Sequence, residues 1–366
     1  MKEIIRILQV VPNMGQGGLE NFIMNLYRNI DKEKIQFDFL VHYKRKEYFD
    51  DEIEQLGGKI YRFSLREDNN ILKYIIKLNR FFKSHKEYKI IHCHMSSIGF
   101  LLFFIAKLNG IKVRIAHSHN SDTEKTLKGF IKSLLIRPYK YLSTINFACS
   151  EKAGNYLFKN KKFEIIPNGI EMDKYKFDDK IRRKIRKELN INQKELVIGH
   201  VGRFQLQKNH EFLIDVFEMI LKKQKNARLV LVGIGKFEEK IKEKVKKLNL
   251  QHKVLFLGLR KDTNELYQAM DCFLLPSFFE GLPLVGVEAQ TSGLKCIFSD
   301  TITKEIKISE NIKFLAIDNA KEWAEEVLNM KAKDRILEYE NAIKSDYNIK
   351  KVVKIIEKVY TEEFLK

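Results

Sequence analysis

The sequence predicts an α/β protein of two domains, each with a parallel sheet covered by helices, that face each other across a central cleft. Strand and helix signals alternate almost from end to end, which is typical of parallel sheets with helical crossovers. The 366 residues, 44% of them hydrophobic, are enough for two ordinary cores. A charged stretch from 168 to 192 lacks the apolar strand pattern, so we place the domain junction there, near residue 170.

The first domain is expected to comprise residues 1–170. Its first strand, Ile4–Val11, leads through a glycine loop into a helix from Leu19 to about Ile30. Short apolar runs predict the other strands at Phe37–Val41, Lys59–Phe63, Ile90–Cys93, Val113–Ala116 and Ile145–Ala148. Ligands of such sheets bind at the carboxyl ends of the strands, so polar residues that follow these strands are site candidates.

The second domain is expected to comprise residues 171–348. A helical pattern at 349–366 ends the chain, and its spacing alone leaves open which domain it covers. The strands of the second domain are predicted at Leu196–Val201, Leu229–Val232, Val254–Leu257, Cys272–Leu275 and Lys295–Phe298, with helices between them.

The charge of the chain favours an anionic partner. It has 67 Lys and Arg against 48 Asp and Glu, a formal net charge of +19. Phospholipid surfaces, nucleic acid and diphosphate substrates are the candidates.

Cysteine usage and hydropathy indicate a cytoplasmic protein. The four cysteines stand in apolar contexts without a CxxC pair, which is typical of buried thiols in a reducing compartment. The N-terminus runs directly into a strand, so no signal peptide is expected. The longest apolar run, 98–106, is too short to span a bilayer.

Two carboxylates, Glu280 and Glu288, flank the start of a predicted helix just after the strand at 272–275. Pro283 suits the first turn of this helix, because its missing N–H would have no partner there. The free N–H groups and the positive end of the helix dipole favour a phosphate beside Glu280. Acids that accept hydrogen bonds from hydroxyls, next to an anion site, suggest a sugar nucleotide. The alternative fits the spacing equally well: Glu280 would be an ordinary carboxylate at a helix N-terminus, and Glu288 a solvated glutamate on the helix.

Glycines and cations follow other strands. Gly17 and Gly18 precede the first helix, where glycine lets backbone N–H groups approach a phosphate, although glycine pairs are also common in turns. Arg203 and Lys208 follow the first strand of the second domain and suit a diphosphate, with solvated surface as the alternative in so basic a chain. The turn at Gly233 could admit a nucleotide against the backbone.

Histidines form two pairs with period-two spacing, His92 with His94 and His117 with His119. Each pair can point to one face of its strand. A zinc site would need the two pairs to face each other, with a supporting second shell. No HExxH or CxxC motif accompanies them, which favours histidines that hydrogen-bond in the core or line the cleft. His119 is the best placed for a polar contact with a substrate.

Two basic amphipathic segments, 71–82 and 127–137, belong to the first domain. Each could lie on an anionic bilayer. The alternative for each is an ordinary helix on the sheet with its lysines outward. Because both occur in one domain, membrane contact by that domain is a hypothesis.

Together these residues resemble the retaining glycosyltransferases of family 4, whose GT-B fold has two Rossmann-like domains facing a central cleft. The similarity is greatest to enzymes that build bacterial capsular and exopolysaccharide repeat units. Lys295 departs from the proline usual in that family, which changes the start of a strand but no site residue. The motifs are Gly17-Gly18-Leu19-Glu20, the strand-end His119, Ile166-Pro167-Asn168-Gly169-Ile170, Gly202-Arg203 with Lys208, and Glu280-Gly281-Leu282-Pro283-Leu284-Val285 with Glu288.

The resemblance implies roles for these residues. The second domain would hold a nucleotide-diphosphate sugar, with Arg203 and Lys208 neutralising the departing diphosphate. Glu280 would contact the transferred sugar and Glu288 would accept hydrogen bonds from ribose hydroxyls. His119 would contact the sugar near the reacting carbon. Further contacts to the substrate would come from Gly17, Gly18, Gly233, Gly281, Leu282, Leu284 and Val285.

The resemblance also implies an activity. A hexosyl or N-acetylhexosaminyl group would pass from a UDP-sugar to a lipid-linked or oligosaccharide acceptor with retention of configuration. No Asp-x-Asp motif stands where a metal would be needed, so no metal cofactor is expected, and no nucleic-acid partner. The helix at 349–366 would pack back on the first domain. The protein would be peripheral on the inner face of the plasma membrane.

Three other classes fit parts of the sequence. A nucleotide-sugar epimerase of the same fold would turn over donor without an acceptor. A dinucleotide oxidoreductase is disfavoured, because no GxGxxG follows a strand with an acid about twenty residues further on. A non-enzymatic scaffold for membrane or nucleic acid rests on the net charge alone, and salt-dependent binding of DNA without affinity for sugar nucleotides would favour it.

Overall fold

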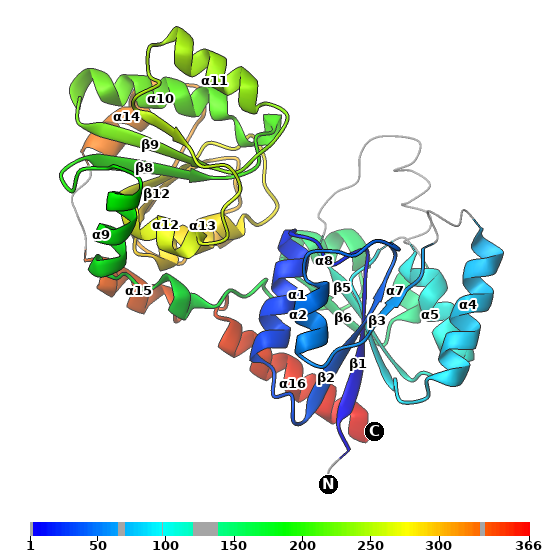
Figure 1. The fold of residues 1–366 in the computed structure, drawn as a ribbon. Coiled ribbons are helices and arrows are strands. Elements are labelled where there is room, and N and C mark those ends of the chain that lie inside the picture. The colour runs from blue at the N-terminus through cyan, green and yellow to red at the C-terminus, as the bar shows by residue number, and fades with distance from the viewer. Residues whose placement is uncertain (1–2, 65–69, 97, 120–137, 330–333) are drawn as a thin grey trace. The chain divides into compact units, whose positions relative to one another are not determined.

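The computed structural model describes residues 3–64, 70–96, 98–119, 138–329 and 334–366. The chain forms two compact units, one of Met1–Ile170 with Ile349–Lys366 and one of Glu171–Asn348 (Figure 1). The first unit has a sheet of seven strands and the second a sheet of six. The predicted fold class, two parallel α/β sheets, is confirmed. That the two sheets face a common cleft stays a prediction.

The first sheet has the strand order β3-β2-β1-β4-β5-β6-β7, and all neighbouring strands are parallel. The order reverses between β1 and β4, and open α/β sheets bind ligands beyond the carboxyl ends of the strands at such a switch point. The strands are β1 (Ile5–Val11), β2 (Ile35–Val41), β3 (Ile60–Arg62), β4 (Ile90–Cys93), β5 (Val113–Ser118), β6 (Ile145–Ala148) and β7 (Glu164–Ile165).

Helices cover both faces of this sheet. Successive side chains of a strand point to opposite faces, and β1 shows this directly. Ile7 and Val11 pack with α1, α2 and α16, whereas Leu8 and Val10 pack with α4, α5, α7 and α8. These helices are α1 (Gly18–Asn29), α2 (Asp50–Gln55), α4 (Ile71–Ser84), α5 (Gly99–Leu108), α7 (Tyr139–Leu142), α8 (Glu151–Phe158) and α16 (Ile349–Leu365).

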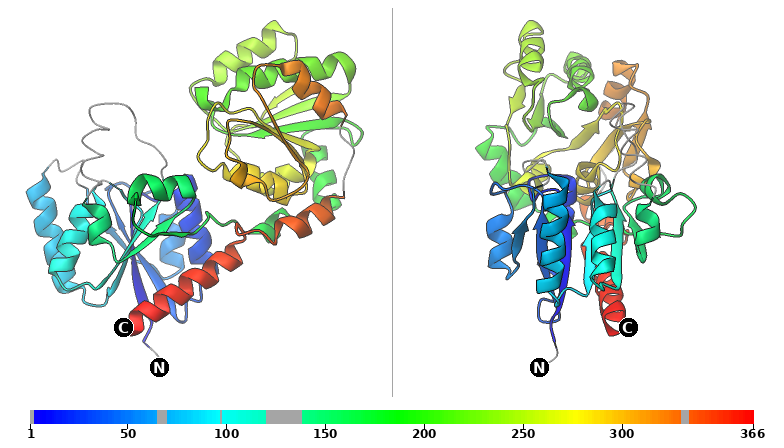
Figure 2. Two further views of the ribbon diagram at one scale, coloured as in Figure 1. Left: turned by 180° about the vertical axis from the view of Figure 1, so that it is seen from behind. Right: turned by 90° about the vertical axis from the view of Figure 1, so that its right-hand side faces the viewer.

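The last helix, α16, belongs to the first unit and runs along its sheet (Figure 2). The N–H of Ile349 donates to the carbonyl of Ile170 at 3.1 Å. This bond joins the start of α16 to Ile170, the last residue of the N-terminal part of the first unit. Val352, Ile356 and Tyr360 are buried in the same core as β1 and α1. Tyr360 therefore brings a hydroxyl from the end of the chain into the centre of the first unit.

The second sheet has the order β10-β9-β8-β11-β12-β13, again with parallel neighbours. Its order reverses between β8 and β11, which makes this the switch point of the second unit. The strands are β8 (Leu196–Val201), β9 (Ala227–Val232), β10 (Val254–Phe256), β11 (Cys272–Leu275), β12 (Lys295–Ser299) and β13 (Ile312–Leu315).

One face of the second sheet packs against α10, α11 and α14 around the fully buried Trp323. On the other face Tyr267 of α12 contacts Phe273 of β11 edge-on, with ring centroids 5.7 Å apart. The helices are α9 (Asp179–Glu188), α10 (His210–Lys223), α11 (Glu238–Lys247), α12 (Thr263–Ala269), α13 (Leu284–Thr291), α14 (Ala320–Leu328) and α15 (Arg335–Ala342), with 3-10 turns η1 (Met172–Tyr175), η2 (Leu206–Lys208) and η3 (Lys304–Ile306).

Two strands were not predicted from the sequence, β7 and β13. Both lie at a sheet edge. The two residues of β7 are exposed, and β13 carries the exposed Lys313. A strand of two exposed residues such as β7 gives no hydrophobic run to detect, whereas β13 carries an apolar signal in Ile312, Phe314 and Leu315 that the prediction missed.

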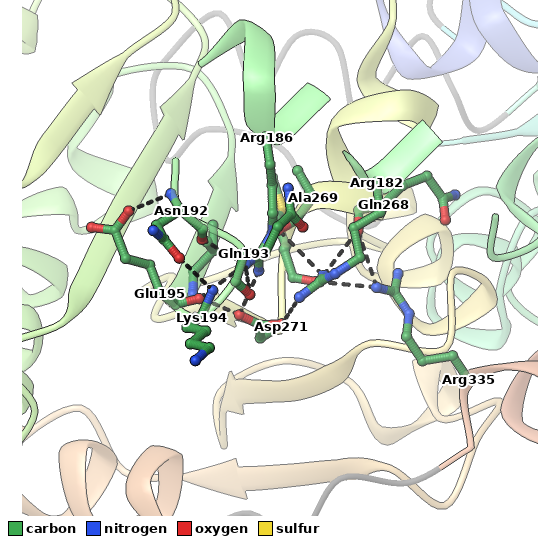
Figure 3. Close-up of polar contacts among 12 residues, drawn as sticks. Arg182, Arg186, Asn192, Gln193, Lys194, Glu195, Gln268, Ala269, Asp271 and Arg335 are labelled. Atoms are coloured by element: carbon green, nitrogen blue, oxygen red, sulfur yellow. Dashed lines mark hydrogen bonds and ion pairs between the residues drawn. The ribbon is translucent and has the colours of Figure 1, made fainter. Parts of the chain in front are cut away.

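Three arginines, one of them fully buried, fix the segment that leads into β11 (Figure 3). Arg186 of α9 is fully buried and its Nη2 lies 2.8 Å from Oδ2 of Asp271. Arg182 pairs with the other oxygen of Asp271 at 2.5 Å. Arg335 of α15 donates to the carbonyls of Gln268 and Met270, and burial lowers its pKa to about 9. This network ties α9 and α15 to the strand whose far end carries Glu280.

We expect Asp271→Asn to destabilise the second unit by about 2 kcal/mol, because the charged hydrogen bonds to two arginines would lose their anion. Urea unfolding followed by the fluorescence of Trp323, the only tryptophan in the chain, measures this directly. The exposed Asp179→Asn on α9 serves as the control. Equal unfolding midpoints for Asp271→Asn and the unmodified protein would contradict the assignment.

Two expectations about the chain as a whole can be compared with the structure. All four cysteines are buried and free, as predicted, and burial raises the pKa of Cys93 to about 11. Among the helices that the structure describes, none is both long enough and apolar enough to cross a membrane.

Candidate functional site

The second unit collects charged side chains at its switch point. Arg203 and Lys208 follow β8, and Glu280 follows β11. These two strands are adjacent and parallel, so their carboxyl ends meet at one edge of the sheet. The predicted cations and the predicted acid therefore belong to the same edge.

Glu280 is held by three donors. Its Oε1 lies 2.5 Å from Nζ of Lys208 and accepts from Oγ of Ser277 at 2.7 Å, while its Oε2 accepts from Nε2 of Gln207 at 3.1 Å. The side chains of Lys208 and Glu280 are only 14% and 8% exposed. The carboxylate thus has one fixed orientation, and the ammonium is kept beside it at the sheet edge.

Arg203 is different, because it is exposed. No carboxylate in the described part of the chain pairs with its guanidinium. An exposed guanidinium two residues beyond a strand end can turn toward an anion without first breaking an ion pair.

Glycines let the loops after β8 and β9 pack backbone to backbone. The N–H of Gly202 donates to Val232 O at 2.9 Å, and the N–H of Phe204 donates to Ile234 O at 3.1 Å. Gly233 has φ of +137°, and a Cβ there would lie 2.2 Å from Gly202 O. The glycine at 233 therefore has a steric role in supporting the loop that carries Arg203.

The N-terminus of α13 is open to an anion. Pro283 occupies the N-cap and the helix starts at Leu284, one residue later than expected. Gly281 is exposed, and a Cβ added to it would have no other atom within 4 Å. Leu282, Leu284 and Val285 are half-buried. In the described structure no protein acceptor takes the N–H groups of Leu284 and Val285. Such groups at the positive end of a helix dipole form an anion site.

Glu288 lies one turn further along α13. The hydroxyl of Tyr267 donates to its Oε2 at 2.9 Å. Burial raises the pKa of Glu288, and hydrogen bonds from Tyr267 and Tyr175 oppose this effect. The carboxylate is positioned by phenols and keeps acceptor capacity for further hydroxyl groups.

In the first unit the glycine pair lies at the start of α1, whose first residue is Gly18. Gly17 is the N-cap, and Glu20 returns its carboxylate to the N–H groups of Gly17 and its own residue, as in a capping box. A Cβ on Gly17 would lie 2.1 Å from Oε2 of Glu20, whereas nothing lies within 4 Å of one on Gly18. Neither glycine has a positive φ. Lack of space therefore accounts for the glycine at 17, whereas neither the backbone conformation nor a neighbouring protein group requires one at 18.

The two histidine pairs face each other in the first unit. Nε2 of His92 lies 3.1 Å from Nδ1 of His117, and Nδ1 of His94 lies 2.9 Å from Nε2 of His119. The rings within each pair also lie together: the centroids of His92 and His94 are 4.3 Å apart and the rings stack, and those of His117 and His119 are 4.1 Å apart with the rings tilted. We call these four residues the histidine cluster.

The histidine cluster is neutral. Burial lowers the pKa of His92 to about 3 and that of His119 to about 3. Burial and the neighbouring rings push the pKa values of His94 and His117 well below the ordinary range. Nitrogens of His92, His94 and His117 lie within 4.8 Å of one another, so one condition set for a metal site is met.

Several residues of these two sites were not predicted. Ser277 and Gln207 orient Glu280, Tyr267 positions Glu288, and Gln9 and Tyr360 bond to the histidine cluster. Gln207 and Ser277 lie within three residues of predicted site residues, which was an available signal. Tyr360 is separated from His92 by 268 positions, and only the packing of α16 brings it there.

The amphipathic segment at 71–82 falls in α4. Its buried face includes Tyr74 and Leu78, whereas Ile71, Leu72 and Ile76 are 55%, 68% and 50% exposed. The helix therefore packs on the sheet and also presents an apolar outer side. The second segment, 127–137, lies outside the described residues.

Two doubly wound sheets with anion-binding features at the switch point of the second define a protein of the GT-B class. Family comparisons agree: "Glycosyltransferase Family 4" matches residues 16–174 and "Glycosyl transferases group 1" matches residues 181–356. The chain is 35% identical over 310 residues to the glycosyltransferase EpsF of Bacillus subtilis, covering 82% of this chain and 80% of that protein. The chain belongs to glycosyltransferase family 4.

Two further relatives are also named as glycosyl- or galactosyltransferases. The capsular polysaccharide biosynthesis glycosyltransferase CapH of Staphylococcus aureus is 23% identical over 94% of this chain and 96% of its own length. An Escherichia coli UDP-Gal:alpha-D-GlcNAc-diphosphoundecaprenol alpha-1,3-galactosyltransferase is 30% identical over 63% of this chain and 62% of its own. Among solved structures, HepE of Anabaena in complex with UDP superposes with a TM-score of 0.79 at 17% identity, over 98% of this chain and 100% of HepE.

Proposed function

We propose that this glycosyltransferase moves a hexosyl or N-acetylhexosaminyl group from a nucleotide-diphosphate sugar to a hydroxyl of a lipid-linked saccharide, with retention, in the synthesis of a bacterial surface polysaccharide. The observation that carries the proposal is the pairing of Lys208 with Glu280 at the switch point of the second unit, next to the exposed Arg203 and the open N-terminus of α13. Cations and free N–H groups bind a diphosphate, and a fixed carboxylate binds sugar hydroxyls.

The relatives support the choice of substrates. The E. coli enzyme is named for a UDP-sugar donor and a diphosphoundecaprenol acceptor, and HepE has been solved with UDP-glucose. We therefore assign a UDP-sugar as donor and a lipid-linked acceptor to this chain. The exposed apolar side of α4, with Lys73 among its residues, is suited to contact with an anionic inner-membrane surface, where such an acceptor resides.

The proposed reaction needs charge stabilisation more than covalent chemistry. The anomeric C–O bond to the diphosphate loosens and leaves an oxocarbenium-like carbon. Arg203, Lys208 and the α13 N-terminus stabilise the departing diphosphate, and preorganised groups of this kind remove several kcal/mol from a barrier. The acceptor hydroxyl attacks on the same face, and an oxygen of the departing phosphate takes its proton. Glu280 positions the sugar, and Glu288 binds the ribose hydroxyls.

Calorimetric titration of the purified chain with UDP, GDP and ADP, with and without EDTA, tests the proposal. We expect tight binding of UDP that EDTA does not weaken. Binding of none of the three would contradict the proposed donor site. Consumption of a UDP-sugar in the absence of any acceptor, with formation of an isomeric sugar, would instead indicate an epimerase.

Arg203→Ala should weaken the binding of the bare nucleoside diphosphate about tenfold or more, because a charge-assisted contact to phosphate is worth about 1.5–3 kcal/mol. The same titration measures this change. Lys240→Ala, an exposed cation on α11 of the same unit, is the control and should bind as the unmodified chain does. Equal affinities for Arg203→Ala and the control would exclude Arg203 from the diphosphate site.

A further inference from the structure

The histidine cluster does not end at its four rings. Nε2 of His94 lies 2.9 Å from Oε1 of Gln9, and Nδ1 of His92 lies 2.5 Å from the hydroxyl of Tyr360. Nε2 of Gln9 donates to the same hydroxyl at 3.1 Å. Gln9 and Tyr360 therefore join the two facing pairs into one chain that runs His119–His94–Gln9–Tyr360–His92–His117.

The two ends of this chain carry buried atoms without a partner of good geometry, Nε2 of His117 and Nδ1 of His119. Burial and the neighbouring rings lower the pKa of His117, and a backbone hydrogen bond with Ile166 opposes this. A backbone group that stabilises a protonated ring nitrogen is a carbonyl, and a carbonyl can only accept. We therefore place the proton of His117 on Nε2, on the side of Ile166, and the placement of the Gln9 amide, with its nitrogen toward Tyr360 and its oxygen toward His94, gives the same direction.

This one assignment fixes all the others. A neutral ring with a proton on Nε2 accepts at Nδ1, so His92 must donate from its Nε2 to His117. His92 then accepts at Nδ1 from the hydroxyl of Tyr360, whose oxygen accepts from Gln9. The amide of Gln9 must therefore turn its nitrogen to Tyr360 and its oxygen to His94, which is the orientation in the structure.

The other half of the chain follows in the same way. Oε1 of Gln9 accepts from Nε2 of His94, so Nδ1 of His94 accepts from Nε2 of His119. His119 is left with an unprotonated Nδ1. Asn168 lies beside His119 and, as placed, raises the pKa of the ring as an acceptor would, but neither its buried Oδ1 nor Nδ1 of His119 has a hydrogen bond of good geometry. Turning this amide, whose oxygen and nitrogen are exchangeable assignments, places an N–H against Nδ1 and satisfies both groups.

A shared metal ion explains the geometry less well. In the pair of His92 and His117 the ring centroids are 5.3 Å apart and the facing nitrogens 3.1 Å apart. The nitrogens are closer than the centroids by about one ring width, which is the largest difference that two facing nitrogens can give. The same holds for His94 and His119, at 5.1 and 2.9 Å. The nitrogens of each pair therefore point straight at each other. That is the arrangement of an N–H···N bond, whereas ligands of one ion point to a common centre.

We propose that Gln9 and Tyr360 are positioning residues that lock all four rings of the histidine cluster as neutral Nε2–H tautomers and so fix the ring of His119 at the edge of the first sheet. The value of this lock rests on the proposed function. His119 is expected near the reacting carbon, where positive charge develops, and a protonated ring would oppose that charge. The chain holds the ring in one orientation and in the form that does not repel an oxocarbenium-like centre.

Nuclear magnetic resonance of the full chain, with ¹⁵N-labelled histidine and no substrate present, tests the lock independently of the proposed function. The chain has nine histidines, and single His→Gln variants assign the four signals. We expect His92, His94, His117 and His119 all to carry the proton on Nε2. A proton on Nδ1 of His94 or His119 would overturn the proposal. Retention of stoichiometric Zn²⁺ with loss of the Nε2 protons of His92 and His119 would also overturn it, in favour of a metal site.

A matched pair of variants tests the role of Gln9. Gln9→Met removes the acceptor for His94, so we expect His94 and His119 to move their protons to Nδ1, with Asn168 as the new acceptor. Gln9→Glu keeps an acceptor for His94, so both rings should stay as Nε2–H. If Gln9→Met fails to fold, the tautomers measured in the unmodified chain still distinguish four Nε2–H rings from rings protonated on Nδ1 and from a metal site.

Steady-state kinetics then test whether the fixed tautomers matter for catalysis. With the donor identified by titration, Gln9→Met should lower kcat about tenfold with KM for the donor within about twofold, and Gln9→Glu should lose less. Unchanged kcat in Gln9→Met, together with the altered tautomers, would overturn the positioning role. Failure of any nucleotide to bind would instead count against the proposed function and leave the tautomer result standing.

Discussion

Glu280→Gln should lower turnover about a hundredfold or more, a loss typical of removing one group that stabilises a transition state. The binding of the bare nucleoside diphosphate should be unchanged or tighter, because Lys208 would no longer be neutralised by the carboxylate 2.5 Å away. Glutamine preserves the size of the side chain and an oxygen for Ser277. Steady-state kinetics and titration with the nucleoside diphosphate, made on the same preparation, separate the two effects.

The matched control for this experiment is Glu239→Gln, an exposed glutamate on α11 that is 82% exposed. It should match the unmodified chain in both measurements. Unchanged turnover in Glu280→Gln would exclude a role for this carboxylate in positioning the sugar. A loss of diphosphate binding as large as the loss of turnover would show that Glu280 supports the loop of Lys208 rather than the transferred sugar.

The central strands and the chemistry at their ends were predictable because both leave a local signal. The strands at 196–201 and 272–275 have the predicted bounds, since each is a buried apolar run. Lys208 and Glu280 follow two of these strands, and parallel pairing alone brings their strand ends together. Edge strands such as β7 left no such signal.

Other features depend on contacts between distant segments. The period-two spacing of His92 and His94 indicated one face of a strand, but not that His117 and His119 lie opposite on the next strand. Tyr360 reaches the cluster only because α16 packs on the first sheet. The choice between a metal site and a hydrogen-bonded chain needed the directions of the ring nitrogens. These are set by side-chain packing and cannot be read from spacing.

We expect the first unit to lose stability steeply as the pH falls below about 6.5. Its four cluster histidines are neutral when folded, with pKa values near 3 for His92 and His119, but titrate near 6.5 when unfolded. Between these values the unfolded chain binds more protons than the folded chain, so protonation favours unfolding. The stabilisation is complete above pH 6.5 and is lost progressively toward pH 3.

The magnitude is large because four groups act together. Each histidine that is protonated only in the unfolded chain costs about 1.4 kcal/mol per pH unit, so four cost on the order of 5 kcal/mol at pH 5.5. That is comparable with the whole stability of many domains, about 5–15 kcal/mol. In the second unit the buried histidines are His200 and His210, and burial lowers the pKa of His210 to about 4. With two such groups, the second unit should lose about half as much.

The two units thus serve as controls for each other. Urea unfolding between pH 7.5 and 5.5, followed by far-UV circular dichroism for the whole chain and by the fluorescence of Trp323 for the second unit, resolves the two transitions. His117→Gln should reduce the pH dependence of the first unit by roughly a quarter, because one of four titrating groups is gone. His252→Gln, at an exposed position of the second unit, should change neither transition. A first unit whose unfolding midpoint does not move between pH 7.5 and 5.5 would mean that the folded cluster binds protons as readily as the unfolded chain, which the buried, hydrogen-bonded rings do not allow.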